Sequence, residues 1–225
     1  MQRRVIKKIV LWSIISFGMA IVLLIFVYRP WVINWGATDA EINRRMPGDA
    51  IVQYPTFNAT RAVTIKAQPE EIWPWIVQFG YKKAGMYCYD WFDNDGIPSA
   101  ESIIQEYQNL KVGDRIPLSE MLYVKVIELN PNQSMLWVFP EGSGPWTNST
   151  WAWELYQEDA QHTRLLTRLR VHADGIIPKV MLDFFEIVMM RKSMLGIKKR
   201  AERMASSPQS VVSDRVMVPE YYQPF

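Results

Sequence analysis

The sequence predicts an α+β domain in which an antiparallel sheet packs around a long C-terminal helix, preceded by one transmembrane helix. Three observations predict this arrangement: an uncharged apolar run near the N-terminus, a series of short aromatic-rich segments, and a helical pattern near the C-terminus. The chain has 225 residues, of which 49% are hydrophobic. That length allows one domain with a full core and additional segments.

The apolar run extends from Ile9 to Tyr28 and contains no charged residue. Twenty helical residues span about 30 Å, the thickness of a hydrocarbon core. Trp12 lies near one end of the run, and three aromatic residues lie at the other end, where they suit the second membrane interface; they are Tyr28, Trp31 and Trp35. A cleaved signal peptide has a shorter apolar region followed by a small-residue cleavage site, so we expect an uncleaved anchor. Basic residues precede the run and favour a cytoplasmic N-terminus, a single-pass cell-membrane topology and an extracytoplasmic domain; they are Arg3, Arg4, Lys7 and Lys8.

The chain divides into four segments by composition. Residues 1–29 form the basic segment and transmembrane anchor, and residues 30–53 form a connector that proline and glycine interrupt. Residues 54–204 form the folded domain, and residues 205–225 form a polar tail.

The domain begins with a predicted strand over Thr60–Ala67, whose side chains alternate in polarity. A helix follows from Gln68, with proline and acidic residues in its first turn, and ends at Gly80. The sheet resumes near Lys111 and continues through two hairpins.

The first hairpin joins Tyr123–Leu129 to Ser134–Phe139. We expect Leu129 to oppose Ser134, which places Val126 opposite Trp137 on one apolar face. The second hairpin joins segments 149–156 and 163–172. A register with Trp153 opposite Leu165 joins their apolar faces, whereas a shift of one residue places a tryptophan against an arginine.

The C-terminal helix is predicted from Asp174 to Met204. Charged residues within it argue against a second membrane span. Apolar residues recur at helical spacing, and we expect this face to pack on the sheet; they are Ile177, Val180, Met181, Phe184, Val188 and Leu195.

Four stretches carry a resemblance to a known superfamily. Thr60–Gly80 contains Ile-x-Ala-x-Pro-Glu-x-Ile-Trp, and Tyr87-x-Tyr89-Asp90-Trp91, Leu110–Asp114 and Met194–Glu202 follow it. Together with the order of elements, these stretches resemble the SRPBCC superfamily of START and birch-pollen-allergen proteins, in an uncharacterised bacterial branch. The resemblance covers about residues 54–204 and implies a helix-grip fold. It does not imply one function, because the superfamily holds lipid carriers, hormone receptors and aromatase/cyclases, and it supplies no catalytic residue.

Composition and motifs exclude several classes of site. The part of the chain after residue 28 carries 21 basic and 23 acidic residues, which disfavours a nucleic-acid partner. Cys88 is the single cysteine, and His162 and His172 have no metal-ligand spacing. We therefore predict no metal and no cofactor, and the sequence leaves open whether the protein is an enzyme.

Charged residues elsewhere in the domain are interpreted as solvated. Asp90, Asp93 and Asp95 do not have the spacing of a calcium loop, so we assign them to a solvated loop. Arg168 and Arg170 alternate outward on the last strand, and we expect a solvated face there.

The aromatic strand faces and the C-terminal helix give the candidate ligand site. These faces fit either a plain core or the wall of an apolar pocket. The predicted ligand-binding residues are Tyr87, Tyr89, Trp91, Trp137, Trp153, Met181, Phe184 and Val188.

Three functions remain open from the sequence. The first is a membrane-anchored domain that binds a lipid or other apolar small molecule between the sheet and the C-terminal helix. The second is a cyclase/dehydrase-type enzyme that uses the same cavity, with tyrosine and aspartate as general acid and base. The third is a structural or partner-binding domain whose cavity is filled with side chains.

Overall fold

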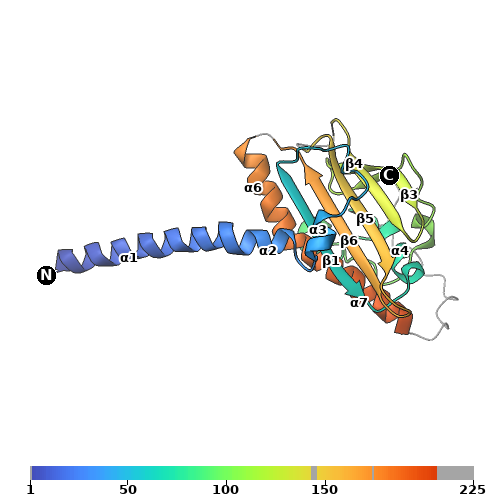
Figure 1. The fold of residues 1–225 in the computed structure, drawn as a ribbon, viewed down its shortest axis with the longest axis horizontal. Coiled ribbons are helices and arrows are strands. Elements are labelled where there is room, and N and C mark those ends of the chain that lie inside the picture. The colour runs from blue at the N-terminus through green and yellow to red at the C-terminus, as the bar shows by residue number, and fades with distance from the viewer. Residues whose placement is uncertain (1, 143–145, 174, 207–225) are drawn as a thin grey trace.

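The computed structural model describes residues 2–142, 146–173 and 175–206. It is an α+β protein in which one six-stranded antiparallel sheet wraps around a long C-terminal helix, the arrangement of a helix-grip fold (Figure 1). A long N-terminal helix projects from this domain. The predicted fold class is therefore confirmed.

The N-terminal helix is continuous through three segments: α1 (Gln2–Leu23), a π-helical segment η1 (Leu24–Tyr28) and α2 (Arg29–Ile33). Within the described residues, Ile6–Ile33 is the one helix long and apolar enough to span a membrane, and its apolar side chains are exposed up to Trp31. This agrees with the predicted anchor in length and composition.

The sheet has the strand order β1-β6-β5-β4-β3-β2. Its strands are β1 (Phe57–Ile65), β2 (Arg115–Pro117), β3 (Tyr123–Asn130), β4 (Ser134–Phe139), β5 (Ser149–Gln157) and β6 (Thr163–Val171). The first strand therefore pairs with the last, and successive hairpins build the sheet outward from there.

The two predicted hairpins form, but their registers differ from the prediction. Val126 opposes Trp137 as predicted, whereas Leu129 opposes Met135 because the pairing shifts by one residue between Val126 and Glu128. In the second hairpin Trp153 opposes Thr167, two residues away from the predicted partner. A shift of two residues keeps every side chain on its predicted face, so the alternating pattern did not distinguish the two registers.

The concave face of the sheet is covered by helices. These are α4 (Pro69–Val77), α6 (Ile176–Phe185), a π-helical segment η3 (Glu186–Met190) and α7 (Arg191–Ser206). The helix α7 packs against α4 and β1. Two short elements lie between α4 and β2, namely α5 (Asp90–Asp93) and the 3-10 turn η2 (Gln105–Tyr107).

The buried face of the C-terminal helix is not the predicted one. The core side of α6, η3 and α7 holds Leu182, Glu186, Met190, Ser193, Met194, Ile197 and Ala201. The predicted stripe instead points outward: Val180 is 60% exposed, Met181 43%, Val188 39% and Leu195 38%. The side chains of Ile177 and Phe184 lie outside the described residues. The prediction was wrong because the buried face includes a glutamate and a serine, which apolar periodicity excludes, and because η3 adds a residue to one turn and shifts the phase.

The convex face of the sheet is covered by the connector. Its helix α3 (Asp39–Asn43) begins with a capping box between Thr38 and Glu41. Gly36 allows the connector to approach β1, since a Cβ at that position would lie 2.1 Å from the carbonyl oxygen of Ala62. The connector is therefore a second layer of the domain.

Arg168 is the centre of this layer. Its guanidinium donates at 2.8 Å to the carbonyl oxygens of Glu41, Ile42 and Arg44 and to the carboxylate of Asp49. The predicted solvated face was wrong, because Arg168 is buried and Arg170 donates to the carbonyl oxygen of Val52. The connector supplies acceptors that strand alternation alone does not reveal.

Candidate functional site

The interior between the sheet and the helices α4 and α7 holds a cluster of aromatic rings around Phe79. The centroid of its ring lies 5.9 Å from those of Trp137 and Trp153, 6.1 Å from that of Trp151 and 6.0 Å from that of Tyr87. Trp151 and Trp153 alternate on β5 and face Trp137 on β4, as their pairing requires. Aromatic side chains therefore fill the part of the interior around Phe79.

Some polar atoms of this apolar interior are hydrogen-bonded within the protein, and others have no partner among the described residues. The indole N–H of Trp151 donates to the hydroxyl of Thr167 at 2.7 Å. The indole N–H groups of Trp75, Trp137 and Trp153 are buried and have no hydrogen-bond partner among the described residues, and neither has the hydroxyl of Ser149. Buried donors without acceptors are rare in native proteins and call for a partner.

Tyr87 is part of this interior, because its side chain is buried and its ring packs against Phe79. Its hydroxyl donates to the carbonyl oxygen of Trp75 at 3.0 Å, and the guanidinium of Arg200 lies 4.8 Å from its ring centroid. Gly196 of α7 packs directly on it, because a Cβ there would lie 2.3 Å from the carbonyl oxygen of Tyr87. Tyr87 therefore fixes the segment before α5 against α7.

Tyr89 and Trp91 lie away from the aromatic cluster. Tyr89 is partly buried beneath Lys192, whose ammonium nitrogen lies 3.6 Å from the ring centroid. Trp91 is 76% exposed and packs against the ring of Phe92, with centroids 5.6 Å apart. The structure therefore brings Tyr87, Trp137 and Trp153 together and leaves Trp91 on the surface.

The carboxylates near α5 hold the local chain in place. Asp90 accepts hydrogen bonds from the amide and the hydroxyl of Ser99, and Asp95 accepts one from the hydroxyl of Tyr81. Asp93 is buried and accepts from the amide of Tyr89, so the predicted solvated loop was wrong for this residue. Burial raises the pKa of the Asp93 carboxyl. Within the described residues no cluster of His, Cys, Asp and Glu has the geometry of a metal site.

The candidate residues of the C-terminal helix are not on the side that faces the sheet. Met181 and Val188 point outward, and the side chain of Phe184 lies outside the described residues. Leu182 and Met190 take the inward positions. Any ligand held between α6 and the sheet therefore contacts these two residues in place of Met181 and Val188.

A buried ion pair that the sequence pattern did not predict joins three elements next to this interior. Arg61 of β1 donates to a carboxylate oxygen of Glu186 in η3 at 2.5 Å and to the carbonyl oxygen of Val32 in α2 at 2.9 Å. Burial raises the pKa of the Glu186 carboxyl, and the charge of Arg61 opposes that rise. A signal for Arg61 was present, because it shares strand parity with the inward residues Val63 and Ile65.

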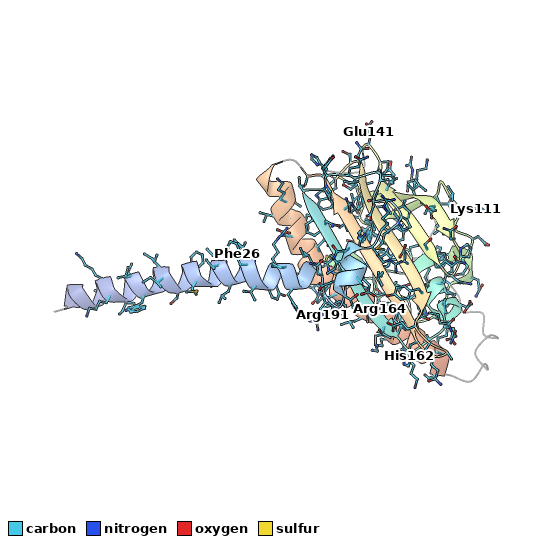
Figure 2. The ribbon with its side chains drawn as sticks, viewed as in Figure 1. Phe26, Lys111, Glu141, His162, Arg164 and Arg191 are labelled. Atoms are coloured by element: carbon cyan, nitrogen blue, oxygen red, sulfur yellow. The ribbon has the colours of Figure 1, made fainter. Side chains whose placement is uncertain are left out.

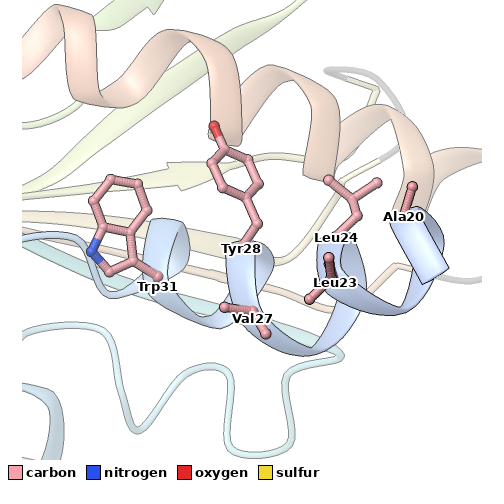
Figure 3. A pocket seen from close by; sticks show the side chains of 6 residues that line it. All are labelled: Ala20, Leu23, Leu24, Val27, Tyr28 and Trp31. Carbon is pink, nitrogen blue, oxygen red and sulfur yellow. The ribbon is translucent and has the colours of Figure 1, made fainter. Parts of the chain in front are cut away.

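An open groove runs along the N-terminal helix where it approaches the domain (Figure 3). Aliphatic and aromatic side chains line it, namely Ala20, Leu23, Leu24, Val27, Tyr28 and Trp31. This groove lies on the segment predicted to span the membrane, and it is separate from the aromatic cluster of the domain.

Comparisons with known proteins give similarity only at the level of solved structures. No family model matches the chain, and no curated protein matches it significantly. A protein from Thermobifida fusca is 11% identical, with a TM-score of 0.46 over 65% of this chain and 94% of that one. The Aha1 dimer from Colwellia psychrerythraea is 14% identical, with a TM-score of 0.41 over 65% and 97% of the two chains. The protein XoxI from Bacillus cereus is 9% identical, with a TM-score of 0.42 over 64% and 94%. These likenesses are too weak to carry an argument about function.

Proposed function

We propose that the chain is a membrane-anchored member of the SRPBCC superfamily that binds a lipid or another apolar small molecule between the sheet and the C-terminal helix. The observation that carries this proposal is the set of buried polar groups without partners on the concave side: the indole N–H groups of Trp75, Trp137 and Trp153 and the hydroxyl of Ser149. The ligand is therefore an apolar molecule with at least one hydrogen-bond acceptor.

The energetic argument is the cost of unpaired donors. A buried donor without an acceptor costs about 1–3 kcal/mol, and several of them beside one cluster add up to a large part of a domain's stability. An acceptor atom on a bound molecule recovers part of that cost. Apolar walls with a few polar groups that fix orientation are the usual composition of small-molecule sites.

The anchor supports the choice of ligand class. In this proposal α1 spans the membrane with its N-terminus in the cytoplasm, because Arg3, Arg4, Lys7 and Lys8 precede the apolar run. The domain is then outside the cytoplasm and next to the bilayer. Molecules that dissolve poorly in water concentrate there, which makes a lipid or a similar apolar compound the natural ligand.

The direct test is to identify molecules that remain bound during native purification of the full chain, by mass spectrometry, and to titrate the protein with fluorescent fatty acids while following tryptophan emission. We expect saturable binding that weakens in Trp137→Phe and Trp153→Phe, because each removes an unpaired donor. Trp151→Phe is the matched control, because the indole N–H of Trp151 already has Thr167 as its acceptor.

Two results contradict the proposal. One is the absence of saturable binding for chemically varied apolar ligands, together with no co-purified molecule, which favours the structural alternative with a filled interior. The other is equal weakening by all three substitutions, which shows that the unpaired donors do not recognise the ligand.

A further inference from the structure

The outer face of the C-terminal helix carries an apolar stripe that no described part of the chain covers. Val180 and Met181 of α6 and Val188 of η3 are 60%, 43% and 39% exposed. Their spacing of seven to eight residues places them on one side of the helix. The opposite side of the same helix is the one packed on the sheet, through Leu182 and Met190. Both sides of the helix therefore carry apolar residues, but among the described residues only one side is covered, by the sheet.

This stripe lies beside the point where the N-terminal helix joins the domain. Arg29 directly follows the uncharged run that ends at Tyr28, and its guanidinium pairs with the carboxylate of Asp183 in α6 at 2.9 Å. Asp183 lies three residues after Val180, so these two residues are neighbours on one side of α6. If α1 spans the bilayer, Arg29 marks the membrane–water boundary, and this ion pair holds α6 at the same level.

A second set of contacts fixes the helix on the same side. The guanidinium of Arg191 lies 5.7 Å from the ring centroid of Trp31 and 5.1 Å from that of Trp35, and α2 contacts η3. Figure 2 shows Arg191 where the N-terminal helix meets the domain. The buried bond from Arg61 to the carbonyl oxygen of Val32 adds a third tie between the anchor and the domain. These contacts give the stripe a defined position relative to α1.

The position of α6 suits a contact with the bilayer surface. Figure 1 shows α6 inclined to the direction of α1 and close to the end of the N-terminal helix that meets the domain. When α1 spans the membrane, α6 therefore lies next to the membrane surface. An amphipathic helix at that level buries its apolar face in the boundary between headgroups and acyl chains.

The charges on the exposed side of this helix are also those of a membrane-surface helix. Lys179, Arg191 and Lys192 are exposed. The two acidic residues of α6 and η3 are both paired with arginines, Asp183 with Arg29 and Glu186 with Arg61. The exposed charge beside the stripe is therefore basic, which attracts phosphate headgroups.

We propose that the Val180, Met181 and Val188 stripe inserts into the headgroup region of the bilayer that α1 spans, so that the domain contacts the membrane at two places and has a fixed orientation. This inference rests on the proposed transmembrane anchor. It goes beyond the proposed ligand site, because it concerns the opposite side of the C-terminal helix.

The test uses the full chain reconstituted in vesicles of phosphatidylcholine and phosphatidylglycerol. Spin labels are attached to Met181→Cys, Phe17→Cys and Met121→Cys, and the accessibility of each label to dissolved oxygen and to a water-soluble nickel complex is measured. Phe17 lies in α1. Met121 is 85% exposed in the segment between β2 and β3, at the opposite edge of the sheet from β1. Cys88 remains in place, because the thiol is buried and burial raises its pKa to about 12, so we expect the label to react with it far more slowly than with an exposed cysteine.

We expect the label at Met181 to favour oxygen over nickel severalfold more than the label at Met121, and the label at Phe17 to show a greater preference still. If Phe17 is lipid-exposed but Met181 behaves like Met121, the stripe does not enter the bilayer and the docking inference is overturned while the anchor stands. If Phe17 is also water-exposed, the anchor itself fails and the docking inference fails with it. A label at Met181 that is shielded from both reagents indicates a protein partner and also overturns the inference.

Discussion

The two faces of the sheet differ in how their buried polar groups are paired. On the convex face the polar groups are charged and closely paired, and the connector supplies many of their partners. On the concave face the side chains are aromatic, and several polar atoms have no partner in the described protein. Trp153 and Glu154 illustrate the difference, because they are neighbours in β5 and belong to opposite faces.

We interpret this difference as one between polar groups that stabilise the fold and polar groups that belong to the proposed ligand site. A buried charge is tolerated only when it is paired and hydrogen-bonded, and Arg168 uses all five of its N–H donors within the protein. Within the described residues, Arg168 therefore needs no added molecule, and Oδ1 of Asp49, which accepts no hydrogen bond, still has an ion-pair contact with Arg170 at 3.3 Å. On the concave face several neutral donors have no partner of either kind, which is why we place the proposed ligand there.

Breaking the convex network gives the largest expected effect. Arg168→Ala leaves Asp49 without its main partner and removes the donors to three connector carbonyl oxygens, so we expect a loss of about 3–5 kcal/mol in the free energy of unfolding. Chemical denaturation of the full chain in detergent measures it. Arg203→Ala is the control, because Arg203 is a surface residue paired with the exposed Glu101, and it is expected to cost about 1 kcal/mol or less. Equal losses in the two variants would contradict the structural role given to the connector.

The Arg61–Glu186 pair tests whether charge on the concave side is also structural. Arg61→Met leaves Glu186 buried without its cation, and we expect a loss of about 3–5 kcal/mol. Arg61→Met combined with Glu186→Leu replaces both charges, so most of that loss is expected to return. A double variant as unstable as the single variant contradicts this account, since it means that the bond to the carbonyl oxygen of Val32, and not the ion pair, stabilises the fold.

The convex network also predicts an acid-sensitive stability. Burial opposes ionisation of Glu41, but hydrogen bonds from Arg164, the amide of Thr38 and Tyr156 outweigh it and lower the pKa of Glu41 to about 2 from 4.5. Because the folded pKa lies below the unfolded one, the stabilisation is present above pH 4.5 and is lost as the pH falls toward 2. The shift corresponds to about 3 kcal/mol at neutral pH.

The measurement compares the free energy of unfolding of the wild type and of Glu41→Gln across this pH range. We expect the difference between the two proteins to shrink as the pH falls from 4.5 toward 2. A constant difference between the two proteins shows that the charge of Glu41 is not responsible.

The sequence predicted the fold well because the fold follows from local patterns. Alternating polarity located the strands, turn residues located the hairpins, and an uninterrupted helical pattern located the C-terminal helix. The registers of the two hairpins were harder to predict. A shift of two residues preserves the face of Trp153, and the bulge near Ile127 leaves no clear signal in the composition.

The candidate site was predicted only in part, for a physical reason. Trp137 and Trp153 belong to the interior because strand parity fixes their face. Met181 and Val188 were assigned to the wrong side, because apolar residues occur on both sides of that helix and periodicity does not say which side meets the sheet. The burial of Arg168 depends on the connector, a segment more than a hundred residues away in sequence, and no local pattern encodes such a contact.

Two tryptophans of the concave face differ from each other in whether the indole N–H is paired. Trp151 and Trp153 lie two residues apart in β5, with ring centroids 5.3 Å apart, and only Trp151 has a partner for its indole N–H. Trp→Phe removes similar volume at both positions, so the cavity terms largely cancel between the two variants. The remaining difference is one hydrogen bond, and we expect Trp151→Phe to be more destabilising than Trp153→Phe by about 1 kcal/mol in ligand-free protein.

Ligand reverses this order if the proposed site is correct. Removal of co-purified molecules by delipidation gives the ligand-free value, and the same two variants are then unfolded with a saturating ligand. A ligand acceptor that pairs with the indole N–H of Trp153 stabilises the wild type and Trp151→Phe more than Trp153→Phe, since binding to the native state adds directly to its stability. A difference between the two variants that is the same with and without ligand shows that the unpaired donor of Trp153 does not contact the ligand, and it favours the structural alternative, in which side chains alone fill the interior.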